Sequence, residues 1–100
     1  MAKVIFSIQY DIYPSKRNDY IGIVKELKNL VSAEGLESYS VYEKKNKENS
    51  FEEVYIFASE EAYEKFEDIQ NERIDILMTK LSDLIKDNST KYTRMSEVIG

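Results

Sequence analysis

The stretch of sequence that decides the fold is KVIFSIQYDI, residues 3–12, which the pair Pro14-Ser15 brings to an end. Apolar and aromatic residues occupy every second position, and a period of two over this length predicts a β-strand with one buried face. The predicted buried face carries Val4, Phe6, Ile8, Tyr10 and Ile12. The opposite face is largely polar and carries Lys3, Ser7, Gln9 and Asp11.

After this strand the apolar residues return every three or four positions, which is the spacing of an amphipathic helix. The residues with this spacing are Tyr20, Ile23, Val24, Leu27, Leu30 and Val31. Gly35 follows at the place where a helix usually requires a left-handed residue. We therefore expect Gly35 to close the helix.

Two further strands are predicted in the middle of the chain. Residues 36–45 carry a weak alternation of apolar residues and serines, which favours an extended segment over a helix. Residues 51–58 contain the continuous β-prone run VYIF and predict another strand. The polar run 44–50 between them predicts a hairpin with a charged, mobile tip.

The second half of the chain predicts helix and then strand. Ser59 is a good helix cap, and Glu60 and Glu61 place negative charge in the first turn, where the helix dipole favours it. The apolar stripe pauses at Gln70-Asn71, so we expect either two helical pieces or one bent helix. A turn at 87–89 then precedes a last alternating strand over residues 92–99.

The predicted order of elements is βαββαβ, and 100 residues leave room for a single domain over residues 1–100. Two right-handed crossovers build an α+β fold, a four-stranded antiparallel sheet with the helices on one face. The strand over residues 51–58 is apolar on both faces, with Val54 and Ile56 on one and Tyr55 and Phe57 on the other, and Ile5 lies opposite the apolar row of the first strand. A sheet with one face in water would show a cleaner polar side, so we expect a homodimer through the open sheet face. The alternative is that tyrosine-rich strands tolerate solvent, because tyrosine joins an apolar ring to a polar hydroxyl.

The charge and hydropathy of the chain disfavour several partners. The 14 basic and 19 acidic residues give a net charge of −5, which disfavours nucleic acid and acidic lipid surfaces. No stretch approaches the ~20 apolar residues of a membrane span. The first residues lack the apolar run of a signal peptide. We therefore expect a cytoplasmic protein with neither a nucleic-acid nor a membrane partner.

The missing residue types narrow the chemistry. The sequence has no Cys and no His, which removes thiol nucleophiles and histidine-based catalysis. A metal would depend on Asp and Glu oxygens alone, and the sequence has no glycine-centred calcium loop. We therefore expect no metal site and no cofactor, and we assign no catalytic residue.

Three junctions resemble the dimeric α+β barrel superfamily, specifically its antibiotic-biosynthesis-monooxygenase-like branch. The first is Tyr13-Pro14-Ser15-Lys16 with Tyr20, which is similar to a Pro-Gly-Lys turn. The second is Gly35-Leu36-Glu37-Ser38-Tyr39, which is similar to a glycine-led second strand. The third is Phe57-Ala58-Ser59-Glu60-Glu61-Ala62, which is similar to a Trp-x-Ser-x-Glu-Ala junction. The resemblance covers nearly the whole chain. It implies ferredoxin-like protomers whose sheets face each other as a barrel, with a small pocket between sheet and helices.

The chain departs from the haem-degrading members of this superfamily, which use an Asn on the first strand with Trp and His on later helices. Trp and His are absent here, so the resemblance does not extend to haem oxygenase activity. By position, Gln9 stands near the strand amide, and Phe66 and Ile76 stand near the two helix positions. Quinol-oxidising members work without a cofactor, and they hold an electron-rich aromatic substrate beside polar side chains.

Two functions from different classes remain. The first is a non-catalytic dimer that binds a small apolar metabolite, and we favour it because no side chain is poised to titrate near neutral pH. The second is a cofactor-independent monooxygenase-like enzyme acting on a small aromatic or quinol substrate. A closed, dry core favours the first, whereas an enclosed cavity of ~300 Å³ or more with converging polar groups favours the second. A ligand-sensing regulatory domain ranks last.

The candidate pocket-lining residues come from the strands and the second helical region. They are Ser7, Gln9, Tyr39, Phe57 and Phe66. Each also has a structural interpretation, since Ser7 and Gln9 are ordinary strand side chains and the aromatic residues suit a core. Arg94 is a further candidate for pairing with an anionic ligand, with an exposed ion pair as the alternative.

Overall fold

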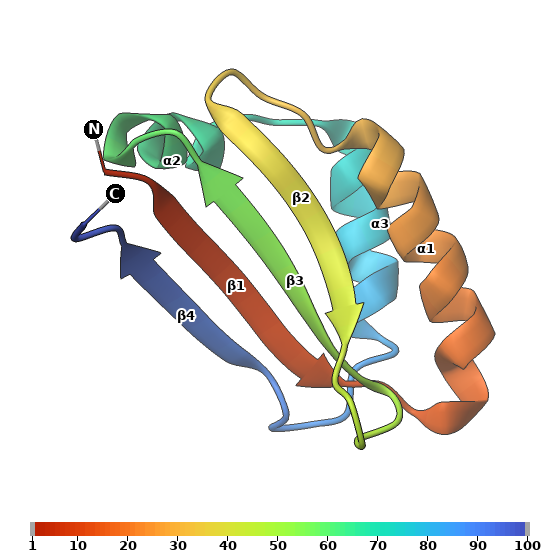
Figure 1. The fold of residues 1–100 in the computed structure, drawn as a ribbon. Coiled ribbons are helices and arrows are strands. Elements are labelled where there is room, and N and C mark those ends of the chain that lie inside the picture. Colours follow the sequence, from red (N-terminus) through yellow and green to blue (C-terminus); the bar gives the residue numbers. More distant parts are fainter. Residues whose placement is uncertain (1, 100) are drawn as a thin grey trace.

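The computed structural model describes residues 2–99 as one four-stranded antiparallel sheet with helices packed on one face (Figure 1). The strands are β1 (Val4–Asp11), β2 (Leu36–Glu43), β3 (Ser50–Phe57) and β4 (Lys91–Ser96), in the order β2-β3-β1-β4. The helical elements are η1 (Pro14–Lys16), α1 (Arg17–Leu30), α2 (Glu60–Glu67) and α3 (Glu72–Ser82). The predicted α+β, ferredoxin-like βαββαβ fold is confirmed.

The central strand β1 pairs with β3 on one side and with β4 on the other. Phe6 lies opposite Tyr55 of β3 and opposite Arg94 of β4. The alternation predicted for β1 holds, because Val4, Phe6, Ile8 and Tyr10 all belong to the core clusters under the helices. Its other residues, including Ser7 and Gln9, therefore point to the open face.

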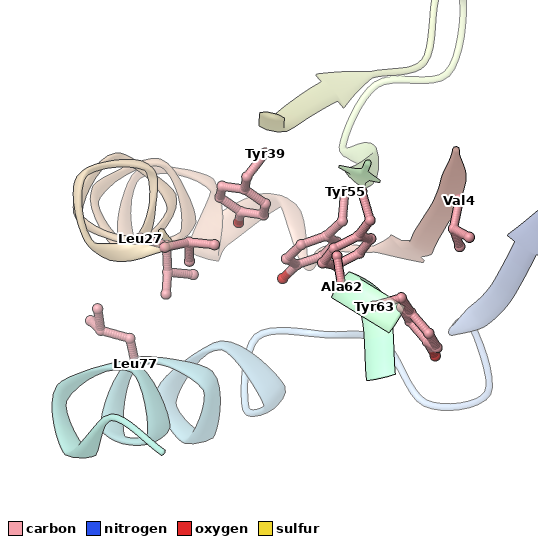
Figure 2. Close-up of a cluster of buried hydrophobic side chains, with 9 residues drawn as sticks. Val4, Leu27, Tyr39, Tyr55, Ala62, Tyr63 and Leu77 are labelled. Carbon is pink, nitrogen blue, oxygen red and sulfur yellow. The ribbon is translucent and has the colours of Figure 1, made fainter. Parts of the chain in front are cut away.

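The core consists of two hydrophobic clusters between the sheet and the helices. In the first, Leu27 of α1 and Leu77 of α3 point toward one another beneath Tyr39 and Tyr55 of the sheet (Figure 2). The second cluster lies around Tyr20 of α1 and Leu81 of α3. The helix-facing side of the sheet is thus unusually rich in tyrosine.

The region after β3 forms two separate helices, which decides between the two predicted alternatives. Ser59 caps α2 by accepting a hydrogen bond of 3.1 Å from the Ala62 amide. Asn71 caps α3 by accepting one of 3.0 Å from the Ile74 amide. An asparagine cap satisfies the free amides of a new helix, so the pause at 70–71 is a helix start rather than a bend.

Gly35 does not close α1, contrary to the sequence-based expectation. The helix ends at Leu30, and Val31 is already extended. Gly35 instead lies in the turn before β2 with φ +84°, and its carbonyl accepts a 2.7 Å hydrogen bond from the Ala58 amide. A Cβ on Gly35 would collide with the Ala62 side chain of α2. The glycine is required by this close approach and not by the helix end.

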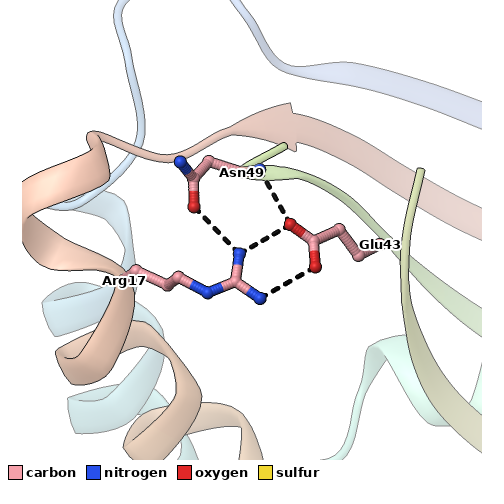
Figure 3. Close-up of polar contacts among 3 residues, drawn as sticks. All are labelled: Arg17, Glu43 and Asn49. Carbon is pink, nitrogen blue, oxygen red and sulfur yellow. Dashed lines mark hydrogen bonds and ion pairs between the residues drawn. The ribbon is translucent and has the colours of Figure 1, made fainter. Parts of the chain in front are cut away.

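The β2–β3 hairpin is tied to the start of α1 (Figure 3). The Arg17 guanidinium donates to both carboxylate oxygens of Glu43, at 2.6 and 2.8 Å, and to the Asn49 side-chain oxygen at 2.9 Å. The Asn49 amide also donates to Glu43 at 2.8 Å. Arg17 and the Asn49 amide together lower the pKa of Glu43 to about 2. The tip is charged as predicted, and its mobility stays a prediction.

The last strand is shorter than expected. β4 ends at Ser96, and the Glu97 amide donates to the Lys3 carbonyl at 2.8 Å. Val98 and Ile99 extend beyond the pairing and are 94% and 91% exposed, so alternation alone overestimated this strand. Within residues 2–99, no helix has the length and apolar character needed to cross a membrane.

Candidate functional site

The helix-facing side of the sheet contains a fully buried carboxylate. Glu53 of β3 lies between Ile8 of β1 and Val41 of β2 and is only 1% exposed. Among residues 2–99 it is the only charged side chain that is fully buried. Burial of an ionisable group normally costs several kcal/mol, so its surroundings decide its state.

Tyrosine hydroxyls surround this carboxylate. Tyr10 donates to one oxygen at 2.8 Å, and Tyr39 donates to the other at 2.7 Å. The Tyr20 hydroxyl lies 2.8 Å from that of Tyr10. Because Tyr10 gives its proton to Glu53, Tyr20 must donate to Tyr10. We call Glu53 with Tyr10, Tyr20, Tyr39 and Tyr55 the tyrosine–glutamate cluster.

Burial dominates the acid–base properties of the cluster. It raises the pKa of the Glu53 carboxyl, and the hydroxyls of Tyr39, Tyr10 and Tyr55 counteract that rise only in part. Burial, together with the Glu53 charge, also raises the pKa values of Tyr10, Tyr39 and Tyr55 well above the usual range. These tyrosines therefore remain protonated hydrogen-bond donors.

An apolar cavity of about 310 Å³ lies on one side of this cluster, between the sheet and helices α2 and α3. Its apolar walls are Phe6, Tyr55, Tyr63, Phe66, Ile74 and Met78. Exposed polar side chains such as Glu67, Gln70 and Asp75 also border it and form its mouth. We call it the apolar cavity.

A second cavity of about 400 Å³ lies on the other side, between β1, β4, the end of α3 and the loop that follows it. Its inner walls include Ile8, Tyr10, Glu53, Met78 and Leu81, and the exposed side chain of Tyr92 also borders it. Exposed residues Lys86, Asp87 and Asn88 border its mouth. We call it the carboxylate cavity, and Met78 is a wall common to both cavities.

The structure separates the five candidate pocket residues. Phe66 lines the apolar cavity, Tyr39 belongs to the tyrosine–glutamate cluster, and Phe57 is fully enclosed in the core. Ser7 and Gln9 lie on the open face of the sheet and therefore border neither cavity. The alternation along β1 places them there, since their neighbours Phe6, Ile8 and Tyr10 face the helices.

The sequence analysis missed Glu53, although one signal was present. Residues Phe51, Glu53, Tyr55 and Phe57 share a parity within the third strand. A single acid within an otherwise aromatic row has to be buried with partners, and unusual buried polar groups mark functional-site candidates.

Arg94 of β4 forms an ion pair with Glu60 at the start of α2. Its guanidinium also lies over the Tyr63 ring, 4.5 Å from the centroid. The ion pair weighed as the alternative for this residue is therefore the observed arrangement, and Arg94 ties the edge strand to α2.

In the part of the chain that the structure describes, no group of three or more acidic side chains is placed to hold a metal ion. Glu53 and its phenol partners are buried between sheet and helices.

Comparison with solved structures identifies the fold. A conserved protein from Methanosarcina mazei superposes with a TM-score of 0.79 at 16% identity, over 95% of this chain and 92% of that one. SnoaB from Streptomyces nogalater, a cofactor-independent oxygenase, gives 0.76 at 10% identity, over 98% and 95%. A structure named as an antibiotic biosynthesis monooxygenase gives 0.71 at 16% identity, over 100% and 99%. The chain has the fold of antibiotic-biosynthesis-monooxygenase-like proteins.

This fold is the one that the three sequence junctions implied. No protein-family model matches the chain, and no curated protein is significantly similar to it in sequence. Identities of 10% to 16% establish a shared architecture, and one architecture hosts many functions. The function must therefore be argued from the cavities of this chain.

Proposed function

We propose that residues 1–100 form one cytoplasmic domain that assembles as a homodimer and binds a small apolar molecule in the apolar cavity. The observation that carries this proposal is the aromatic lining of that cavity. Its volume of about 310 Å³ falls at the lower end of the range for small-molecule sites. A ligand of about two fused rings suits this size.

The rings around the apolar cavity offer flat surfaces to such a ligand. Phe6 and Tyr63 have ring centroids 5.8 Å apart, and Tyr55 and Phe66 have centroids 5.7 Å apart. Tilted pairs at this separation are favourable and hold their rings in fixed orientations. The polar residues lie at the mouth, so the ligand is expected to be apolar inside and polar at one edge.

The open face of the sheet supports the homodimer. Ile5 lies opposite Ile56 of β3 and Met95 of β4, which makes an apolar row across three strands. The tyrosines of β1 and β3 point to the helices, and Tyr42 of β2 lies on the open face outside this row, so solvent-tolerant tyrosines do not account for the row. A second copy of the same sheet would cover the row.

A matched pair of substitutions tests the binding site. Ile74 lines the apolar cavity, whereas Ile76, two residues along α3, is 42% exposed and borders no described cavity. Ile74→Phe should fill part of the cavity and weaken binding of a naphthol at least about tenfold in a fluorescence titration. Ile76→Phe should leave the affinity unchanged. Failure of the wild-type chain to bind, or equal binding by all three proteins, would contradict the proposed site.

A cofactor-independent monooxygenase-like enzyme acting on a small aromatic or quinol substrate is the second candidate. It is supported by the fold shared with SnoaB and by a buried carboxylate beside a cavity. Oxygen uptake with a naphthohydroquinone, above its autoxidation rate and reduced by Glu53→Gln, would support it. Identical oxygen uptake with and without the protein would contradict this second candidate function.

A further inference from the structure

Glu53 has no positive partner. None of the ion pairs formed within residues 2–99 includes it, and no lysine or arginine contributes to its pKa shift. Buried carboxylates are normally compensated by a cation or a metal. The three phenols around Glu53 offer hydrogen bonds without a charge, so its electrostatic compensation is incomplete.

Glu53 also retains capacity for another hydrogen bond. An ionised carboxylate offers about four acceptor positions. Tyr10 and Tyr39 occupy one on each oxygen, and Tyr55 contributes a weaker third interaction. Glu53 is one of the residues that line the carboxylate cavity, although its side chain is almost completely buried.

The walls of the carboxylate cavity suit an amphipathic cation. Ile8, Met78 and Leu81 offer apolar contacts, and the exposed ring of Tyr92 is available to a cation. The chain as a whole carries a net charge of −5, which favours the approach of cations.

We propose that the carboxylate cavity is a binding site for a small primary amine that carries a short apolar or aromatic group, with its ammonium paired to Glu53. An ammonium supplies the missing charge and a hydrogen-bond donor together, whereas a neutral hydroxyl supplies only the donor. The proposal is independent of the apolar cavity, because Met78 is the only residue that lines both cavities.

Binding should depend on pH in a defined direction. Where Glu53 is protonated, an incoming ammonium displaces that proton, so amine affinity should rise with pH until Glu53 is ionised in the free protein. The groups that face Glu53 are Tyr10 of β1, Tyr39 of β2, Tyr55 of β3 and, through Tyr10, Tyr20 of α1. These phenols stay neutral, since burial raises their pKa values. Lys86 and Asp87 are the charged groups at the mouth.

Isothermal titration calorimetry of the full chain with phenethylamine and with phenylethanol tests the site, because the two probes differ in charge and hardly in shape. The amine should bind at least about tenfold more tightly, with net proton release at a pH where Glu53 is protonated. Glu53→Gln should abolish this preference, so that the amine binds no more tightly than phenylethanol. Glu52→Gln, the neighbouring change on the open face, should behave as wild type.

Carbon NMR of the wild-type chain keeps the test decisive if Glu53→Gln fails to fold. At a pH where Glu53 is protonated in the free protein, saturating phenethylamine should shift the Glu53 carboxyl carbon to its ionised position, and phenylethanol should not. Equal affinity for the two probes, unchanged amine affinity in folded Glu53→Gln, or a stationary Glu53 signal would each overturn the proposal.

Discussion

Two glycines of this chain show how differently the same residue type is used. Gly35 has φ +84° and faces the Ala62 side chain, so both its conformation and its surroundings exclude a Cβ. Gly22 lies inside α1 with open space around its Cα. The residue type alone does not distinguish the two positions, because the difference lies in the atoms that a Cβ would meet at each.

Alanine substitution at these glycines should change stability in opposite directions. Gly35→Ala should lower the free energy of unfolding by about 1–3 kcal/mol, because it forces a left-handed alanine against α2. Gly22→Ala should raise it by about 0.5–1 kcal/mol, because it removes backbone entropy from an exposed helix position. Urea unfolding of both variants beside the wild type measures the pair. A loss of stability at both positions would show that Gly22 is constrained as well.

Glu53 should impose a characteristic pH dependence on stability. The ordinary pKa of a glutamate is 4.5 and burial raises it here, so between those values the folded chain holds a proton that the unfolded chain has released. The associated stabilisation is complete below about pH 4.5 and is lost as the pH rises through the folded-state pKa. The free energy of unfolding of the wild type should therefore fall, relative to Glu53→Gln, as the pH rises.

Chemical unfolding at a series of pH values checks this prediction. Glu52→Gln removes the same charge from the open face and serves as the control. Parallel pH profiles for the wild type and Glu53→Gln would contradict the assignment of a raised pKa to Glu53.

For single residues, the sequence predicted which side chains are buried better than it predicted which side chains form the candidate site. Alternation placed Tyr10 and Phe6 against the helices and Ser7 and Gln9 on the opposite side, as the structure shows. The partners of Glu53 come from three strands, and their hydroxyls meet only once the sheet register is set. The aromatic row around Glu53 signals its burial, but the identity of its partners on other strands leaves no local signal in the chain.

Among the elements, the β2–β3 hairpin depends on a polar contact with η1 and α1. Glu43, Arg17 and Asn49 join the two strands to the helix start through charge-assisted hydrogen bonds. Folding lowers the pKa of Glu43 from 4.5 to about 2, so this contact stabilises the fold above about pH 4.5 and is lost as the pH falls toward 2.

Acidification should therefore loosen the hairpin before the rest of the sheet. Amide hydrogen exchange should accelerate at Lys44 and Ser50, which close the tip through hydrogen bonds of 2.8 and 3.3 Å, as the pH approaches 2. After correction for the intrinsic pH dependence, Glu43→Gln should show the same acceleration at neutral pH, and Lys45→Gln should not. Unchanged protection in Glu43→Gln would show that the strand pairing holds the tip unaided.

The elements themselves were largely predictable, because period and capping are local properties. The strands, the first helix and the helical region after Ser59 follow from apolar spacing, which left open whether that region is two helices or one bent helix. Gly35 was assigned to the wrong feature, since a positive φ is equally required by a helix end and by a turn against another helix. The last strand was overestimated because its final residues alternate without a partner strand.

For the whole molecule, the open face of the sheet is the feature that the single chain leaves unexplained. Its apolar row joins Ile5, Ile56 and Met95, and Met95 is 51% exposed. The register made this row visible, whereas the sequence indicated only that apolar residues occur on both sides of the strands. That a second copy of the chain covers this row is our proposal.

Sedimentation at micromolar concentration should show a homodimer. Ile56→Lys places a charge in the apolar row and should shift the protein to monomer while it stays folded, because a buried unpaired charge opposes association. Ile76→Lys on the exposed side of α3 should remain dimeric. A wild-type monomer under these conditions would contradict the proposed assembly.

The concentration of tyrosine around the two cavities has a practical consequence. The chain contains eight tyrosines and no tryptophan, so its ultraviolet emission comes mainly from phenol rings. Tyr55 and Tyr63 border one cavity, while Tyr10 and Tyr92 border the other. A ligand in either cavity contacts tyrosine rings that fluoresce. The tyrosine fluorescence of the unlabelled protein should therefore change when the ligand binds.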